Sequence, residues 1–137
     1  MISVTLRPGH ARSVNPHEKA DYMILNWRVS SQPHIWSPPT DLVESQDCYI
    51  VRVEIAGMDE KDFNISLDQN ILTIQGARLD IPDRRAYHQM EINFGEFITA
   101  VELPGPVDVE NVSAEYLSGF LVITFQKALP KHIPIHE

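Results

Sequence analysis

The residues of this chain best suited to catalysis or metal binding are six histidines and a single cysteine, Cys48. The histidines are His10, His17, His34, His88, His132 and His136. We find no combined Cys/His spacing of the kind that gathers ligands around a metal ion. Cys48 lies within a predicted strand and has no base nearby in the sequence, so we interpret it as a structural thiol. The sequence predicts no metal site and no catalytic nucleophile.

Other kinds of chemistry are equally poorly represented. The chain has neither G-x-x-x-x-G-K-[ST] nor G-x-G-x-x-G, so no nucleotide site is indicated. The carboxylates of Asp59, Glu60 and Asp62 are better explained as a solvated turn than as an acid/base pair. The net charge of −8 argues against nucleic acid and anionic membranes as partners, because both require a basic surface. We therefore expect no enzyme, no cofactor and no small-molecule substrate.

Cysteine usage and the N-terminal sequence suggest the compartment. One cysteine among 137 residues cannot form an internal disulfide, which fits a reducing compartment. The first twenty residues lack the apolar core of a signal peptide, and no apolar run approaches the length that spans a bilayer. These features predict a cytoplasmic protein.

Three parts of different character follow one another along the chain. Residues 1–38 hold scattered prolines and no run that predicts a strand, so we expect an arm that is partly disordered or helical, with a helix candidate at 16–29. Residues 39–127 contain short stretches in which apolar and polar residues alternate, such as Tyr49 to Ile55 and Phe63 to Leu67. This period of two, interrupted by turn residues, predicts an antiparallel β-sandwich. Residues 128–137 form a proline-containing tail.

Six short motifs follow one another through the central part and the tail. They are Trp36-Ser37-Pro38-Pro39-Thr40-Asp41-Leu42-Val43-Glu44, Ile55-Ala56-Gly57, Leu72-Thr73-Ile74-Gln75-Gly76-Ala77-Arg78, Gly95-Glu96-Phe97 with Leu103-Pro104, Ala114-Glu115-Tyr116-Leu117-Ser118-Gly119-Phe120-Leu121, and Ile133-Pro134-Ile135. Each motif is short, but the order makes the match specific over about two thirds of the chain. The sequence resembles the small heat-shock protein (α-crystallin) family in its bacterial and plant-type form. The resemblance implies an immunoglobulin-like sandwich of seven or eight strands.

By the same resemblance, the tail is an assembly latch. Ile133 and Ile135 point to one side of an extended segment, and Pro134 restricts the backbone between them. Burying both side chains would contribute roughly 3–6 kcal/mol before the cost of ordering the tail. The family's latch docks in a groove of a neighbouring subunit, which corresponds here to Ile65, Leu67 and Val112. The alternative is a tail with two incidental isoleucines.

The resemblance also implies a dimer formed by strand exchange. The segment between Gly76 and Phe97 is long for a hairpin connection. Its residues Tyr87, His88, Gln89 and Glu91 are expected to pair with the edge strand of a second subunit, at Asp41, Leu42 and Val43. The alternative is a mobile surface loop. One departure from the family concerns this dimer. Thr99 stands where relatives often have an arginine, which pairs with the carboxylate that Glu91 matches here. Another arginine would have to replace that partner of Glu91, and the nearby candidates are Arg78, Arg84 and Arg85.

Apolar residues of the arm have no evident core to join. They are Met23, Ile24, Leu25, Trp27, Ile35 and Trp36. Exposed apolar surface marks interaction sites, and methionine adapts to varied partners, so we expect these residues to bind clients. The alternative is that they pack inside the oligomer, and both states can alternate.

The sequence thus predicts an ATP-independent chaperone, a holdase that binds partly unfolded proteins, prevents their aggregation and assembles as dimers into larger oligomers. The second hypothesis is a monomeric co-chaperone sandwich that docks on an ATP-dependent chaperone. It would need neither the latch nor the crossing strand.

Overall fold

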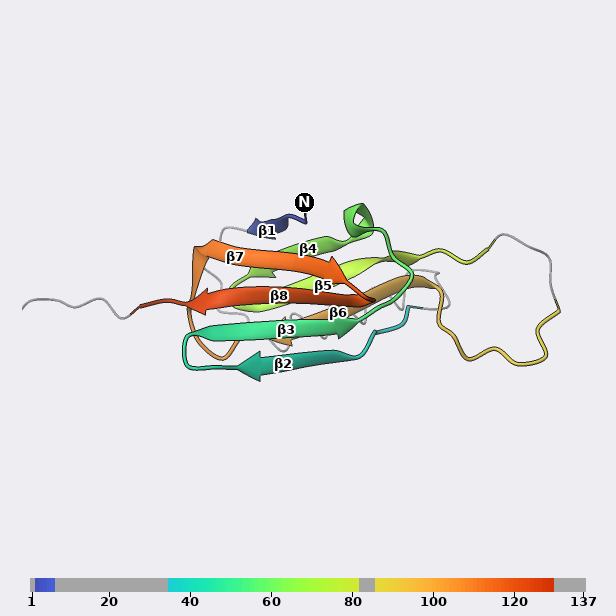
Figure 1. Cartoon of the computed structure of the whole chain (residues 1–137), viewed down its shortest axis with the longest axis horizontal. Coiled ribbons are helices and arrows are strands. Elements are labelled where there is room, and N and C mark those ends of the chain that lie inside the picture. The colour runs from blue at the N-terminus through green and yellow to red at the C-terminus, as the bar shows by residue number, and fades with distance from the viewer. Residues whose placement is uncertain (1, 7–34, 82–85, 130–137) are drawn as a thin grey trace, which may run out of the picture.

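The computed structural model describes residues 2–6, 35–81 and 86–129. In these ranges the chain forms two four-stranded β-sheets packed face to face (Figure 1). One sheet has the strand order β1-β4-β5-β6 and the other has the order β2-β3-β8-β7. The one helical segment of the described ranges is a 3-10 turn, Glu60–Asp62. The predicted all-β sandwich is confirmed.

The strand bounds follow the alternation of the sequence closely. The strands are β1 Val4–Leu6, β2 Thr40–Glu44, β3 Cys48–Glu54, β4 Asn64–Asp68, β5 Ile71–Arg78, β6 Gly95–Glu102, β7 Val107–Leu117 and β8 Phe120–Lys127. All neighbouring strands pair antiparallel except β1, which pairs parallel with β4. Two strands differ from expectation. β1 lies in the range predicted as an arm, and β5 continues past Gly76 to Arg78.

Tight turns explain why neighbouring strands pair. Between β4 and β5, Gln69 and Asn70 adopt φ of 49° and 66°, and between β7 and β8, Ser118 and Gly119 adopt 54° and 83°. Two successive residues with positive φ match the twist of a two-residue hairpin. Within the described ranges the chain crosses from one sheet to the other through the 3-10 turn after β3 and through the proline-containing segment after β6.

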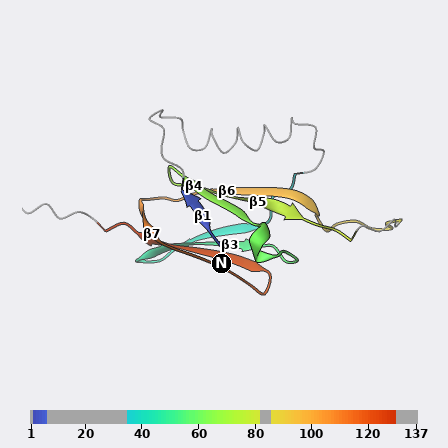
Figure 2. The ribbon, with the colours of Figure 1, turned by 90° about the horizontal axis from the view of Figure 1, so that it is seen from above.

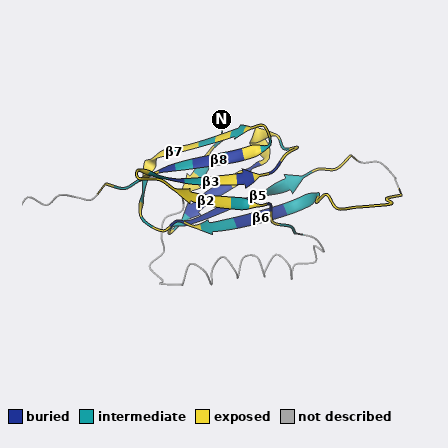
Figure 3. Cartoon of the chain, turned by 60° about the horizontal axis from the view of Figure 1, so that its bottom comes forward, coloured by how far each residue is buried: buried dark blue, intermediate teal, exposed yellow. Residues whose placement is uncertain are grey.

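The core lies between the sheets and consists of the inward-facing residues of the alternating strands. Its fully buried members include Val51, Val53, Ile55, Ile65, Leu72, Ile74, Phe97, Leu121, Ile123 and Phe125. Figure 3 shows this burial concentrated along the middle of the strands. Four aromatic rings cross the core in contact with one another, with centroids 5.6 Å apart for Trp36 and Phe97, 6.3 Å for Phe97 and Phe63, and 5.1 Å for Phe63 and Tyr116. The row joins β6 of one sheet to β7 of the other.

Gly76 has no space for a side chain. A Cβ at this position would lie 2.7 Å from the carbonyl oxygen of Asp62 and 2.9 Å from Cζ of Phe97. We expect Gly76→Ala to lower the free energy of unfolding by about 1–3 kcal/mol, because the backbone or the Phe97 ring must shift. Urea denaturation followed by circular dichroism measures the effect. Ser113→Ala, at an exposed site in β7, is the control and should leave the midpoint unchanged. Equal midpoints for both variants would contradict this account of the core.

Candidate functional site

The residues predicted to line the latch groove come together in the structure. Ile65 and Leu67 are buried on β4, and half-buried Val112 on β7 packs against the same apolar cluster. The groove is not empty, however, because β1 lies between the two strands: it pairs with β4 and also contacts β7. Figure 2 shows β1 running from the side of β7 toward β4 where the two layers meet.

The occupant of the groove was missed from the sequence. Val4 aligns with Ile65 and Leu6 with Leu67, while Ile2 and Val4 pack against the core. This corrects the expectation that the first 38 residues contain no strand. A signal was present, since apolar residues at positions 2, 4 and 6 alternate with Ser3 and Thr5. Five residues are too few for such a pattern to stand out from chance.

The segment expected to exchange between subunits projects from the sandwich. The described parts of the connection between β5 and β6 extend beyond the ends of these strands (Figures 1 and 3). Its apolar side chains are exposed, with 82% for Leu79, 64% for Ile81, 67% for Met90 and 65% for Ile92. Residues 86–91 form no strand within the single chain. Figure 3 marks both arms of the connection as mostly exposed over their described length.

The expected recipient of that segment is also accessible. β2 pairs with β3 on one side and forms the edge of its sheet on the other. Leu42 is 37% and Val43 45% exposed, while Asp41 makes a 3.0 Å ion pair with Arg52 of β3. An exposed strand edge presents a row of backbone donors and acceptors that another strand can pair with. The two predicted halves of the exchange are thus both uncovered within the chain.

Arg78 contacts the residues at which the projecting segment leaves the sandwich. Its guanidinium donates hydrogen bonds to the carbonyl oxygens of Asn93 and Ala56 and lies over the rings of Trp36, at 4.5 Å, and Phe94, at 5.3 Å. These contacts join the end of β5 to the residues that precede β6. Among the arginines proposed as a partner for Glu91, Arg78 is therefore engaged elsewhere, and Arg84 and Arg85 lie outside the described residues.

Thr99, where relatives often have arginine, has a local role. It is buried, and its hydroxyl lies 2.8 Å from the hydroxyl of Thr40 at the start of β2. The Thr40 hydroxyl also donates to the carbonyl oxygen of Pro38 at 2.9 Å. This pair links β6 of one sheet to β2 of the other. The threonine thus fixes the edge strand from inside the sandwich.

Trp36 differs from what the sequence led us to expect. Its backbone bridges to β6, donating to the carbonyl oxygen of Glu96 at 3.1 Å and accepting from the amide of Ile98 at 3.0 Å. Its indole Nε1 donates to the carbonyl oxygen of Gly95, and its ring packs on Phe97. Trp36 therefore does join the core, and Ile35 beside it is half-buried. The other expected client-binding residues, Met23, Ile24, Leu25 and Trp27, lie outside the described residues.

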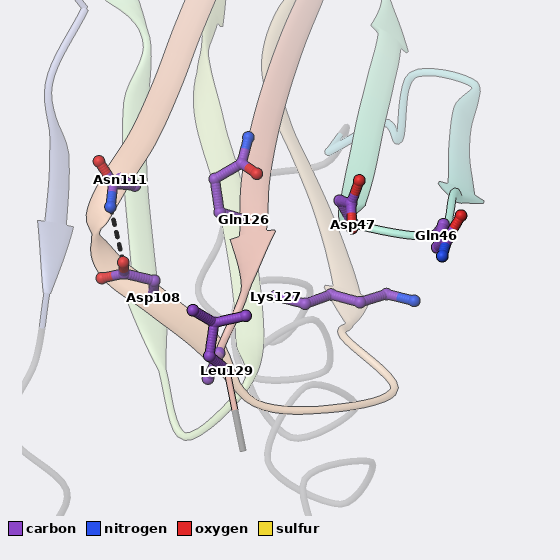
Figure 4. Close-up of a pocket in the computed structure, with 8 residues that line it drawn as sticks. Gln46, Asp47, Asp108, Asn111, Gln126, Lys127 and Leu129 are labelled. Carbon is purple, nitrogen blue, oxygen red and sulfur yellow. Dashed lines mark hydrogen bonds between the residues drawn. The ribbon is translucent and has the colours of Figure 1, made fainter. Parts of the chain in front are cut away.

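A polar hollow of about 490 Å³ lies where β8 ends (Figure 4). Within it, the amide of Asn111 donates to the carboxylate of Asp108 at 2.6 Å. The Lys127 ammonium donates to Glu44 at 2.9 Å, and this hydrogen bond raises the pKa of Lys127 above its ordinary value. The contact between Lys127 and Glu44 links the end of β8, from which the chain continues to the predicted latch, to the end of β2. Ile133, Pro134 and Ile135 themselves lie outside the described residues, as does the helix candidate at 16–29.

The part of the chain that the structure describes meets the requirements of neither a metal site nor a membrane-spanning helix. No group of three or more His, Cys, Asp or Glu that could hold a metal ion occurs within residues 2–6, 35–81 and 86–129. In the same ranges, no helix is long and apolar enough to cross a membrane. Cys48 is a free thiol whose Sγ lies 3.7 Å from Oε1 of Gln126. The described surface has apolar side chains along its strand edges and beside the β4 groove, and such surfaces are suited to binding other polypeptides.

Comparisons with known sequences place these surfaces in context. Residues 41–136 match the model of the Hsp20/alpha crystallin family. Small heat shock protein C4 of Rickettsia felis is 35% identical over 95 residues, which cover 68% of this chain and 58% of the relative. Heat shock protein 16 of Schizosaccharomyces pombe is 28% identical over 116 residues, covering 79% of each chain. The matched part thus spans less than two thirds of the Rickettsia protein.

Solved structures agree on the fold. Heat shock protein 16.0 from Schizosaccharomyces pombe superposes with a TM-score of 0.61 at 27% identity, covering 73% of this chain and 98% of that one. A small heat-shock protein from Xylella fastidiosa gives a TM-score of 0.63 at 24% identity, covering 76% and 100%. With its two-sheet sandwich and the match over residues 41–136, the chain belongs to the Hsp20/alpha crystallin family of small heat shock proteins.

Proposed function

We propose that this protein is an ATP-independent holdase, which binds partly unfolded proteins and prevents their aggregation. The observation that carries the proposal is the display of large apolar side chains on the edges and projecting segment of a small heat shock sandwich, among them Leu79, Met90 and Ile92. Unfolding proteins expose apolar segments, and a surface of this kind binds them without specific side-chain pairing. Family members generally form oligomers and bind client proteins.

The proposal keeps the three-part division of the chain. Residues 39–127 form the scaffold, residues 1–38 contribute client contacts through Met23, Ile24, Leu25 and Trp27, and residues 128–137 form the latch. β1 modifies this division, because residues 4–6 pair with the scaffold. We place the activity in the cytoplasm, where the free thiol of Cys48 would remain reduced.

Assembly in this proposal has two levels. In the first, residues 86–91 of one chain add a strand to the exposed edge of β2 in another, which gives a dimer. In the second, Ile133 and Ile135 dock beside Ile65, Leu67 and Val112 of a neighbouring chain, which joins dimers into larger particles. Exposure of the projecting segment and of Leu42 and Val43 supports the first level. The apolar character of the groove supports the second.

The holdase activity has a direct test. A thermolabile enzyme heated with the intact chain, without ATP, should scatter less light than the enzyme heated alone, and added ATP should not change the result. The triple variant Met23→Ser/Leu25→Ser/Trp27→Ser should protect less, because it removes apolar contact area from the arm. A control with Glu60→Ser and Glu110→Ser, both at exposed polar sites, should protect fully. No protection by the intact chain at equimolar ratio would refute the proposal.

The latch is tested by particle mass. Light scattering after size exclusion should give a large particle for the intact chain and dimers for Ile133→Ala/Ile135→Ala, since the variant loses most of the buried apolar area of the latch. His136→Ala keeps both isoleucines and should retain the large particle. An intact chain that runs as a monomer, unaffected by the double substitution, would instead favour a co-chaperone sandwich.

Strand exchange is tested with proline. Successive residues of a strand direct their N–H groups to opposite sides, so one of His88 and Gln89 must donate to β2 of the partner. His88→Pro and Gln89→Pro, made separately, should therefore differ, and the more damaging one should weaken the dimer about tenfold, as expected for a lost hydrogen bond and an unsatisfied acceptor.

The matched control is Gln89→Ala, which keeps the backbone N–H and should dimerise normally. Because residues 86–91 form no strand within the chain, thermal stability of the sandwich should not change in any of the three variants. Analytical ultracentrifugation in the Ile133→Ala/Ile135→Ala background isolates the dimer equilibrium. If both proline variants dimerise as the control does, residues 86–91 do not form the exchanged strand.

A further inference from the structure

The groove predicted to receive the latch of another chain is covered by this chain's own residues 2–6. β1 runs parallel to β4, with Val4 opposite Ile65 and Leu6 opposite Leu67. Ile2 and Val4 pack against the apolar cluster that also contains Val112. The free edge of β4 can pair with one strand at a time, because each backbone donor and acceptor of the edge is used once. A latch that docked there would have to displace β1.

The two segments present similar side chains to the groove. In Ile2-Ser3-Val4, the residues at positions 2 and 4 are half-buried, and Ser3 between them is exposed. Ile133-Pro134-Ile135 has the same spacing of two β-branched residues, which an extended segment directs to one side. Both segments can therefore fill the same apolar sites beside Ile65 and Leu67. Their central residues differ, since Pro134 lacks the backbone donor that Ser3 has.

β1 covers only part of the groove. The strand has three residues, and its last side chain, Leu6, is 44% exposed. Beside Leu6 lies an open cavity of about 250 Å³, lined in part by Leu67, Val107 and Val109, and Val109 is 49% exposed. The groove is thus longer than the segment that occupies it. A short strand that leaves adjacent apolar surface uncovered is easier to displace than one that fills its site.

We propose that residues 2–6 are an internal competitor of the latch, so that the β4 groove switches between its own β1 and the Ile133-Pro134-Ile135 segment of a neighbouring chain. This inference rests on the latch described under Proposed function. With β1 in place the β4 groove is closed to the latch of a neighbour, and with β1 released the groove accepts that latch. The occupancy of the groove by β1 then sets how readily dimers join into larger particles.

Peptide binding tests the competition. The probe is a fluorescent peptide of residues 129–137, and the host is the full chain carrying Ile133→Ala/Ile135→Ala, so that its own tail does not compete. Adding Ile2→Ser/Val4→Ser to the host should tighten peptide binding by about tenfold in fluorescence anisotropy, because the apparent affinity rises with the fraction of open grooves. Ser3→Ala/Thr5→Ala, at the exposed positions of the same segment, should leave the affinity close to that of the host.

A second measurement keeps the test valid if the Ile2→Ser/Val4→Ser host folds poorly. An unlabelled peptide of residues 1–8 should displace the tail peptide from the host, whereas the same peptide with both substitutions should not. Measurable binding of the tail peptide with equal affinity in all hosts, and no displacement, would overturn the competition and leave the latch standing. Failure of the tail peptide to bind any host would overturn the latch itself, and the competition with it.

Discussion

Two sheets that pack face to face leave apolar side chains uncovered along the edges where the layers meet, and the surfaces of this protein follow from that constraint. Ile65 and Leu67 on β4 and Val112 on β7 belong to the core by contact, yet they lie beside the open side of the sandwich. A closed barrel would have no such seam. The seam requires a covering segment from this chain or another, and β1 provides one here.

The scaffold around these edges is fixed by contacts between the sheets. The row of Trp36, Phe97, Phe63 and Tyr116 crosses the core, and Gly76 allows the Phe97 ring to lie against the backbone of β5. The hydroxyls of Thr40 and Thr99 hold β2 near β6. These contacts tie β2 to the core, so the sandwich presents this edge strand in a defined position.

Much of the fold could be predicted from the sequence, and the failures have physical causes. Alternation over five or more residues identified β3, β4 and β6, because burying one face of a sheet requires it, whereas β8 was identified from a run that is apolar on both faces. β1 escaped detection since three residues carry too little pattern, and its pairing depends on a groove formed by residues more than fifty positions away. Trp36 looked unattached because its partners, Phe97 and Arg78, are distant in sequence. The contacts between subunits could be inferred only from family resemblance, since one chain's alternation does not encode its neighbour's position.

β1 and the groove that it covers belong to the same chain, and this has a consequence for how groove occupancy depends on protein concentration. A segment of the same chain meets its site at an effective concentration set by the connecting residues, whatever the number of other molecules present. A segment from another chain meets that site at a rate proportional to the amount of protein. In the proposed assembly, dilution would therefore favour the self-covered subunit and accumulation the joined one, so synthesis of more chains would by mass action alone open the seam to neighbours.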